Sequence, residues 1–282
     1  MARPFSSIDA KRIIERHQNI TEKLNSAVSS VEKYRTKAKN ASEALVAQEV
    51  LRVLADIPIE EINRDKRGIR VKALRDYGYR TIADISTASV YSIASVHGIS
   101  EDAAYSIKRI VNDIVSKARQ EVKIRLSTDN RSQEATALVL ALSQYHRSQK
   151  NADECRQLLN QNKQTIGYAV EDLNSSTGTL KWFFSSKAKK QKATEAYNIL
   201  VSLIDGDYGN EAETQISNAD VIDRSSNSEA WQEFATNYIR FFNDLEDINP
   251  GVLGNDDSMY GLPEDLAREV QEECFFPEGL LC

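Results

Sequence analysis

The sequence is poor in the residues that break regular structure. Its 282 residues include 11 glycines and 5 prolines, fewer than a turn-rich β protein would use. Three cysteines, Cys155, Cys274 and Cys282, are scattered and odd in number. They predict the reducing cytoplasm, and neither a disulfide framework nor a Cys-x-x-Cys metal site. No apolar run approaches the roughly 20 residues of a membrane span, and the N-terminus has no apolar signal region, so no membrane partner is expected.

Catalytic motifs are also missing from the sequence. There is no Gly-x-x-x-x-Gly-Lys-Ser/Thr loop to hold ATP phosphates, and no Gly-x-Ser-x-Gly elbow or Cys/His pattern. His17, His97 and His146 are far apart and show no metal-ligand spacing. Residues 205–216 do not form an EF-hand loop, because Asn210 stands at the sixth position, which requires glycine, and Ile216 at the twelfth, which requires glutamate. A helix end followed by a loop is predicted there. We therefore expect no enzyme, cofactor or metal in this chain.

Helical periodicity accounts for most of what remains. A long helix is predicted over residues 7–56, ending before Pro58 because proline disfavours helix at the preceding residue. Its seam positions alternate four and three residues apart, as in a coiled coil: Ile13, His17, Ile20, Leu24, Ala27, Val31, Tyr34, Ala38, Ala41 and Leu45. Because several of these side chains are small or polar, we favour an antiparallel partner within the chain. A parallel homodimer is the alternative, and His17 is interpreted as a tolerated seam residue.

A second helical block is predicted over residues 132–173, with an apolar stripe long enough to lie against the first helix. A turn at 174–178 comes before the apolar cluster 180–184, which either tucks into the helical core or forms a contact patch. The next helix begins with several lysines, which favour a solvated helix start, and is expected to end near Ile204.

The acidity of the chain lies in its last part. Residues 205–282 contain 19 acidic and 3 basic residues, a net charge of −16, whereas the whole chain has −6. This part will not bind nucleic acid by charge, but it can contact a basic surface. Within it, Ser228 is expected to cap a helix with a buried aromatic face, and residues 249–259 are expected to form a linker.

The most informative stretch covers residues 57–125. Apolar residues spaced as in a helix lead to Gly98, after which Ile99, Ser100 and Ala104 begin a second helical pattern. This arrangement predicts two helices joined by a tight turn, with Ile99 filling the gap, Ser100 capping the second helix and Ala104 allowing close approach. It resembles the helix-hairpin-helix motif of DNA-binding proteins, in which Ser100 stands at the position of a second glycine.

The upstream half, around Gly68, resembles a degenerate first motif of a tandem pair. A run of matching positions joins the two halves: Leu74, Gly78, Thr81, Asp84 and Ile85. Thr81 and Asp84 are also predicted to form a capping box. Residues 57–114 as a whole are similar to the C-terminal domain of the bacterial RNA polymerase α subunit. The arginine that this domain uses before its first turn falls on Ile69, one residue from Arg70.

This resemblance implies contact with the phosphate backbone of double-stranded DNA, without reading of sequence. The donors would be the backbone amides of Gly98, Ile99 and Ser100 at the positive end of a helix. The remaining expected DNA-binding residues are Arg67, Gly68, Arg70, Lys72, Lys108 and Arg109. Residues 60–125 contain 13 basic and 9 acidic residues, net +4, a modest footprint for nucleic acid. Glu101 and Asp102 suit the helix dipole but would repel DNA, so a protein-contact role stays the alternative.

The end of the chain contains Leu-Pro-Glu-Asp-Leu and then Phe-Pro-Glu-Gly-Leu, within residues 262–280. This pairing resembles the segment that precedes the motor of Snf-type helicase-like DNA translocases. The resemblance implies that the chain is the N-terminal region of a larger ATPase, with ATP and magnesium bound in a motor domain beyond it. Its expected protein partners are that motor and a separate partner protein. An ordinary docking segment is the alternative interpretation of these residues.

Together these patterns predict an all-α fold, in which long antiparallel helices form a bundle or coiled-coil-like scaffold with an inserted helix-hairpin-helix domain. Four parts are expected: a long helix (1–56), the hairpin domain (57–125), a returning helical scaffold (126–204) and an acidic helical tail (205–282). The expected function is a non-catalytic accessory region of a DNA translocase that binds the DNA backbone. The alternative is a helical scaffold that docks a partner protein or the motor.

Overall fold

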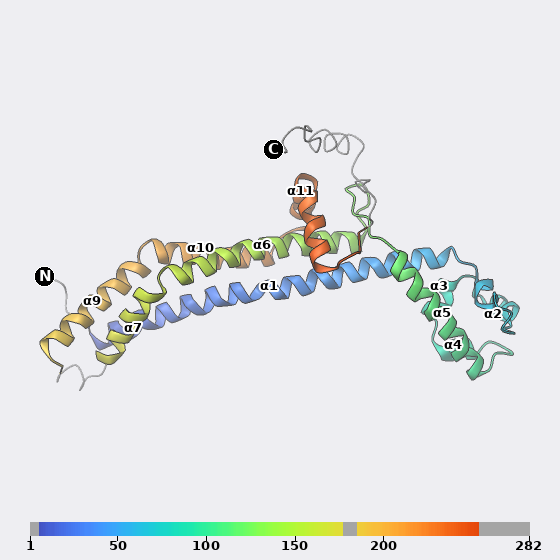
Figure 1. The fold of residues 1–282 in the computed structure, drawn as a ribbon, viewed down its shortest axis with the longest axis horizontal. Coiled ribbons are helices and arrows are strands. Elements are labelled where there is room, and N and C mark those ends of the chain that lie inside the picture. Colours follow the sequence, from blue (N-terminus) through green and yellow to red (C-terminus); the bar gives the residue numbers. More distant parts are fainter. Residues whose placement is uncertain (1–5, 177–184, 254–282) are drawn as a thin grey trace, which may run out of the picture. The chain divides into compact units, whose positions relative to one another are not determined.

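The computed structural model of the protein describes residues 6–176 and 185–253. It confirms the all-α fold class, because these residues form helices and no β-strand (Figure 1). The elements are α1 (Ser7–Ala55), η1 (Ile59–Asn63), α2 (Val71–Tyr77), α3 (Ile82–Thr87), α4 (Val90–Ala94), α5 (Glu101–Glu121), α6 (Gln133–Gln161), α7 (Lys163–Ser176), α9 (Lys187–Ile204), α10 (Asp207–Asp223) and α11 (Asn227–Ile248). The described chain divides into two compact units, residues 6–37 with 140–230 and residues 38–139 with 231–253.

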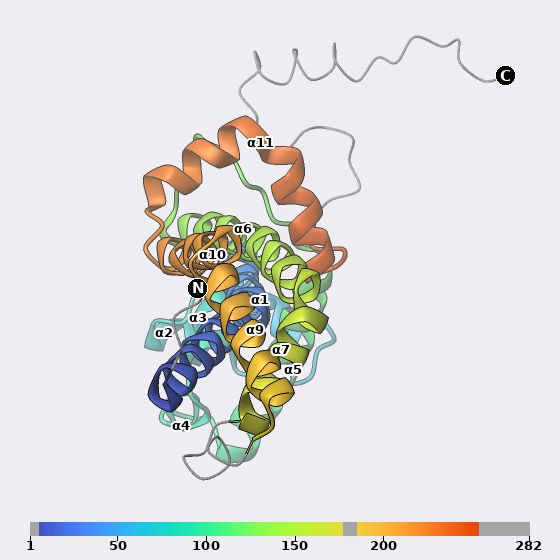
Figure 2. The same cartoon turned by 90° about the vertical axis from the view of Figure 1, so that its left-hand side faces the viewer.

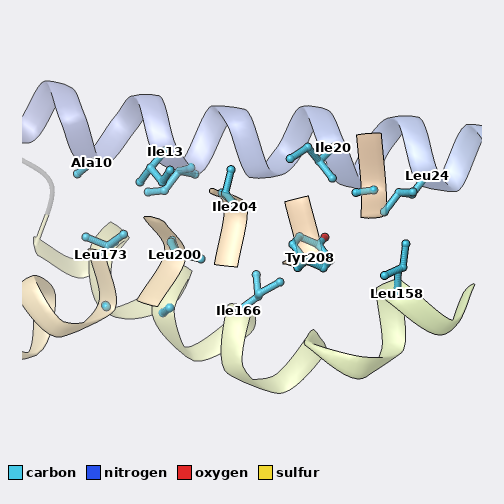
Figure 3. Packing of buried hydrophobic residues seen from close by; sticks show 14 of the residues in the cluster. Ala10, Ile13, Ile20, Leu24, Leu158, Ile166, Leu173, Leu200, Ile204 and Tyr208 are labelled. Atoms are coloured by element: carbon cyan, nitrogen blue, oxygen red, sulfur yellow. The ribbon is translucent and has the colours of Figure 1, made fainter. Parts of the chain in front are cut away.

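The first unit is a helical bundle around one buried apolar cluster. Ala10 of α1 lies near Leu173 of α7, and Leu24 of α1 lies near Leu158 of α6 (Figure 3). Since sequence numbers rise along α1 as they fall along α6 and α7, these helices run antiparallel to α1. Full burial of a leucine such as Leu24 stabilises the fold by about 1.5–3 kcal/mol. The predicted seam of the long helix is thus buried against helices of the same chain, which favours the internal partner over a homodimer.

The one histidine in this seam is a packing residue. His17 is half-buried, and its Nε2 atom lies 3.3 Å from the Thr21 hydroxyl. Burial lowers the pKa of His17, because the charged imidazolium loses hydration. This position agrees with the interpretation of His17 as a tolerated seam residue.

The expected loop after residue 205 is wrong, because α10 begins at Asp207 and continues to Asp223. Gly209 is buried in its first turn, where a Cβ would clash with the carbonyl oxygen of Ile204 at the end of α9. The glycine therefore allows close approach of two helices, whereas its neighbours in the sequence predict a loop. Tyr208 and Ala212, on either side of it, belong to the buried cluster.

Hydrogen bonds from α1 and α6 hold the end of α10. The Tyr34 hydroxyl donates to Asp223 Oδ1 at 2.8 Å, and Lys33 Nζ lies 2.9 Å from the same atom. Gln144 of α6 donates its amide to the carbonyl oxygen of Ile222 at 3.0 Å, which satisfies an acceptor at a helix C-terminus. The bonds from Lys33 and Tyr34 lower the pKa of Asp223. In Figures 1 and 2, α1, α6 and α10 accordingly lie side by side.

The second unit contains the hairpin domain, residues 57–125. Its short helices enclose an apolar core made of Ile62, Leu74, Ile82, Ile85, Ile93, Ile107 and Val111. The predicted capping box is confirmed, since Thr81 accepts from the Asp84 amide and Asp84 accepts from the Thr81 amide. The α1 helix ends at Ala55, as Pro58 predicts. Backbone bonds from Ile59 to Arg80 and from Ile82 to Ile57 then join the entry of the domain to the start of α3.

From Trp231 onward, α11 packs in the same unit through its aromatic face. Trp231 donates Nε1–H to the Thr136 hydroxyl at 3.3 Å, and Phe234 packs edge-on against Phe241 at 5.3 Å between ring centroids. Non-helical dihedrals at Asn237 kink the helix. The prediction of buried aromatics is confirmed for these rings, but the predicted cap at Ser228 is wrong. Instead Ser226 caps the helix by accepting from the Glu229 amide, and its own amide donates back to that carboxylate.

The expected linker from residue 249 is wrong for its described part. Val252 is buried and accepts a 3.0 Å backbone bond from Ile124, while Lys123 donates to Gly251. Asn249 donates to the Ser42 hydroxyl at 2.9 Å. This turn is therefore part of the packed second unit. The apolar cluster 180–184 and the motor-like segment 262–280 lie outside the described residues.

The predicted second helical block differs from the structure in two ways. The block divides into α6 and α7 at Asn162, and α7 continues to Ser176 through the start of the turn predicted at 174–178. The helix that follows ends at Ile204, as predicted.

Candidate functional site

The turn between α4 and α5 has the conformation that the sequence predicts. Gly98 adopts φ +83°, a left-handed value that costs a residue with a Cβ about 1–2 kcal/mol. Ile99 is 8% exposed and Ala104 is fully buried. The isoleucine thus fills the space between the helices and the alanine allows them to approach, which confirms the conformational prediction for these positions.

Only some of the expected amide donors in this turn are available. The Ile99 amide already donates to the carbonyl oxygen of Val96 at 3.0 Å. The amides of Gly98 and Ser100 have no acceptor among the described residues. The Ser100 hydroxyl accepts from the Ala103 amide at 3.2 Å, as predicted for a cap. The next amides, in the first turn of α5, have no intrahelical acceptor, so the turn presents several donors at the positive end of a 21-residue helix.

The structure brings an arginine of the first half of the domain to this turn. A Cβ built on Gly98 would lie 2.5 Å from Nη1 of Arg70, which precedes α2. Arg70 is exposed and forms no ion pair among the residues that the structure describes. Two sequence-predicted residues that are 28 positions apart therefore meet at one place. Both residues are among the expected DNA-binding positions, but no pattern in the sequence predicts their contact.

Asn63 organises the loop between η1 and α2. Its side-chain oxygen accepts from the Ile69 amide at 3.3 Å, and Gly68 and Lys66 have positive φ values of 74° and 55°. Arg67, one of the predicted contacts, forms an exposed ion pair with Asp65 at 2.7 Å. Such a pair contributes about 0–1 kcal/mol, so the arginine is able to exchange this carboxylate for another anion.

The Lys108 side chain forms hydrogen bonds within the domain. Its Nζ atom donates to the carbonyl oxygens of Ile85 and Ser86 at 3.2 and 2.9 Å, and burial lowers its pKa. These carbonyls belong to the last turn of α3, where a cation is favoured by the helix dipole. The contacts therefore assign Lys108 to the packing of α5 on α3.

The two remaining predicted cations, Lys72 and Arg109, are exposed. Neither forms an ion pair within residues 6–176 and 185–253. By contrast Arg64 pairs with Glu61, and Arg75 with Glu60. Arg70, Lys72, Arg109 and Lys66 are thus exposed cations without an ion pair in the described part of the domain, and the exposed carboxylates Glu101 and Asp102 lie in the first turn of α5.

Other ionisable groups of the described chain do not assemble into a reactive site. Burial raises the pKa of the Cys155 thiol to about 11, which makes it a poor nucleophile. Within the described ranges, no three His, Cys, Asp or Glu side chains gather as a metal-binding group. No helix among these residues is long and apolar enough to cross a membrane.

Comparison with known proteins adds no assignment. The sequence matches no protein-family model and no curated protein, and no solved structure matches the fold. The geometry around Gly98 and Arg70 is therefore the basis for any functional conclusion.

Proposed function

We propose that the hairpin domain binds the DNA backbone without sequence preference. The observation that supports this most directly is the contact of Arg70 with the turn at Gly98. It places a guanidinium group beside the unused amides of Gly98 and Ser100. Guanidinium groups and amides at a helix N-terminus are the donors that bind phosphate oxygens in proteins, and such contacts position a protein on DNA without reading bases.

Arg70 also reduces the electrostatic repulsion that a phosphate would meet at this site. Glu101 and Asp102 stabilise the start of α5 through the helix dipole, but they repel an approaching phosphate. A cation from the other half of the domain offsets part of that repulsion at the turn. Lys72 and Arg109, which have no ion pair in the described part of the chain, supply further exposed charge.

The wider role that we propose is an accessory DNA-binding region of a Snf-type DNA translocase. The resemblance of residues 262–280 to the segment before such a motor supports this assignment. ATP hydrolysis with magnesium would belong to the motor domain, and the present chain would contribute the DNA contact. In this role the chain itself is not an enzyme.

The test is the affinity of the purified chain for a labelled random-sequence duplex, measured by fluorescence anisotropy at about 50 and 200 mM salt. Three phosphate contacts give a salt slope near −2.7, so affinity should fall about 40-fold between these concentrations. Arg70→Gln should weaken binding and reduce the slope by about 1. Arg52→Gln, on the exposed surface of α1, makes the same change in net charge and should have little effect.

A variant that removes a negative charge should have the opposite effect on duplex affinity. Glu101→Gln removes a negative charge beside the turn, so it should raise duplex affinity a few-fold while it lowers helix stability by about 0.3–1 kcal/mol. Absence of duplex binding at low salt, or equal effects of Arg70→Gln and Arg52→Gln, would overturn the proposal.

A groove in the second unit favours protein docking as a second candidate function. It has a volume of about 650 Å³ and lies between the end of α1, η1 and α5. Val53, Ile57 and Ile114 form its half-buried apolar part, and charged residues surround them. An apolar floor with a polar rim is the usual composition of a protein-binding surface. Ile114→Arg should abolish a complex with the motor domain, measured by size-exclusion chromatography, and leave duplex affinity unchanged.

A further inference from the structure

An exposed tyrosine is held in a fixed position beside the Gly98 turn. Tyr77, the last residue of α2, is 55% exposed, and its hydroxyl lies 3.3 Å from the Ser95 hydroxyl in the α4–α5 connection. Its ring stacks on Tyr79, with centroids 5.5 Å apart and an interplanar angle of 30°. Tyr79 is itself anchored, because its amide donates to the carbonyl oxygen of the fully buried Leu74 at 3.0 Å.

The contacts with Ser95 and Tyr79 fix the position of the Tyr77 ring before any ligand binds. Tyr79 covers one side of the ring, while more than half of the side chain stays open to solvent. A large side chain that is fixed before binding loses little conformational entropy when a ligand covers it. Exposed tyrosines elsewhere in the domain, such as Tyr91, have no ring contact among the described residues.

Tyr77 and the proposed phosphate site lie along one short helix. The residue before α2, Arg70, meets the connection at Gly98, and the last residue of α2 meets the same connection at Ser95. At 1.5 Å per residue, the backbones of residues 70 and 77 are about 10 Å apart. This span corresponds to about three stacked bases at 3.4 Å each.

We infer that Tyr77 is a stacking platform for an unpaired base of a strand whose phosphate lies at Arg70 and Gly98. A cationic groove combined with an aromatic surface is the arrangement by which proteins bind single-stranded nucleic acid, because every base offers a flat face. A fully paired duplex keeps its bases inside and cannot use the ring. The ligand class is therefore DNA with unpaired bases, such as a single strand or a frayed end. This inference rests on the proposed function, since it requires backbone binding at the turn.

The experiment compares three labelled probes of equal length: a duplex, a single strand, and a single strand that contains abasic sites throughout its centre. Tyr77→Ala should weaken binding of the normal single strand about fivefold or more and leave the duplex and the abasic strand within twofold. Tyr77→Phe keeps the ring and should retain the affinity. Tyr91→Ala, which removes an 84% exposed tyrosine of α4, is the matched control and should change none of the three.

The outcomes separate this inference from the proposed function. If no probe binds the wild-type chain, both fail. If the duplex binds in an Arg70-dependent manner and Tyr77→Ala changes nothing, the stacking platform is refuted and backbone binding stands. If Tyr77→Ala weakens all three probes equally, the residue acts through the fold or the backbone, and the stacking platform is again refuted. Circular dichroism of each variant confirms that the helices persist.

Discussion

Gly98→Ala tests how the turn and Arg70 depend on each other. The positive φ of Gly98 makes alanine unfavourable there by about 1–2 kcal/mol. The new Cβ would also lie 2.5 Å from Nη1 of Arg70, so the guanidinium must move by about 1 Å to restore an ordinary contact. Because this group is the end of a flexible, exposed side chain, its movement should cost less than about 0.5 kcal/mol.

Gly68→Ala is the matched control for this substitution. Gly68 has a similar φ of +74°, and a Cβ there meets nothing within 4 Å. Both variants should therefore lower local stability by about 1–2 kcal/mol, with a difference below about 0.5 kcal/mol. Removing Arg70 in addition, as Gly98→Ala/Arg70→Ala, should recover only the small steric part.

Amide hydrogen exchange measures this change locally. The Ala104 amide, which bonds to the Ser100 carbonyl oxygen at 2.9 Å, should exchange about 5- to 30-fold faster in Gly98→Ala than in wild type. Unchanged protection would show that the turn does not need a left-handed residue. If the Ala104 amide of Gly98→Ala/Arg70→Ala exchanged as slowly as in wild type, the destabilisation would come from the contact with Arg70 and not from backbone strain.

Three further substitutions test the packing within the two units. Gly209→Ala should destabilise the first unit by about 1–3 kcal/mol or more, because its Cβ clashes with the Ile204 backbone. Gly167→Ala should instead stabilise α7 by about 0.5–1 kcal/mol, since its Cβ has open space. Urea unfolding measures both effects, and an unchanged stability of Gly209→Ala would contradict the close approach of α10 to α9. Burial raises the pKa of Asp244 to about 6, above its ordinary value of 3.8. The folded chain thus binds the proton more tightly, so this group's contribution is fully present below pH 3.8 and is lost as the pH rises through 6. Asp244→Asn should therefore raise the free energy of unfolding at pH 8 by roughly 2 kcal/mol and flatten its dependence on pH between 4 and 7; an unchanged pH profile of stability would show that the carboxyl is not desolvated.

Local sequence patterns were sufficient for several elements. The heptad seam and Pro58 placed the first long helix at residues 7–56, and the structure has Ser7–Ala55. Thr81 and Asp84 form the predicted capping box, and Ser100 caps α5. These predictions succeed because helix periodicity and capping depend on residues within one or two turns of each other.

Predictions failed where a distant part of the chain changed the meaning of a local signal. Glycine and aspartate near residue 206 indicated a loop, but Gly209 allows α10 to approach the end of α9, and a helix forms. The segment from residue 249 was expected to be a linker, but Ile124 donates a backbone bond to Val252 and the Lys123 side chain donates to Gly251. Lys108 donates to the carbonyl oxygens of Ile85 and Ser86 at the end of α3, a contact that its place in the sequence does not predict.

The all-α class, the long helix and the glycine turn at Gly98 follow from the sequence alone, since each depends on spacing or on a backbone conformation that only glycine adopts easily. Which candidate residues lie together depends on the tertiary packing. Arg70 reaches the Gly98 turn and Tyr77 lies beside Ser95 because α2 packs along the α4–α5 connection. Contacts between residues so far apart depend on how the buried core of the domain packs, and side-chain spacing along the chain has no information about that packing.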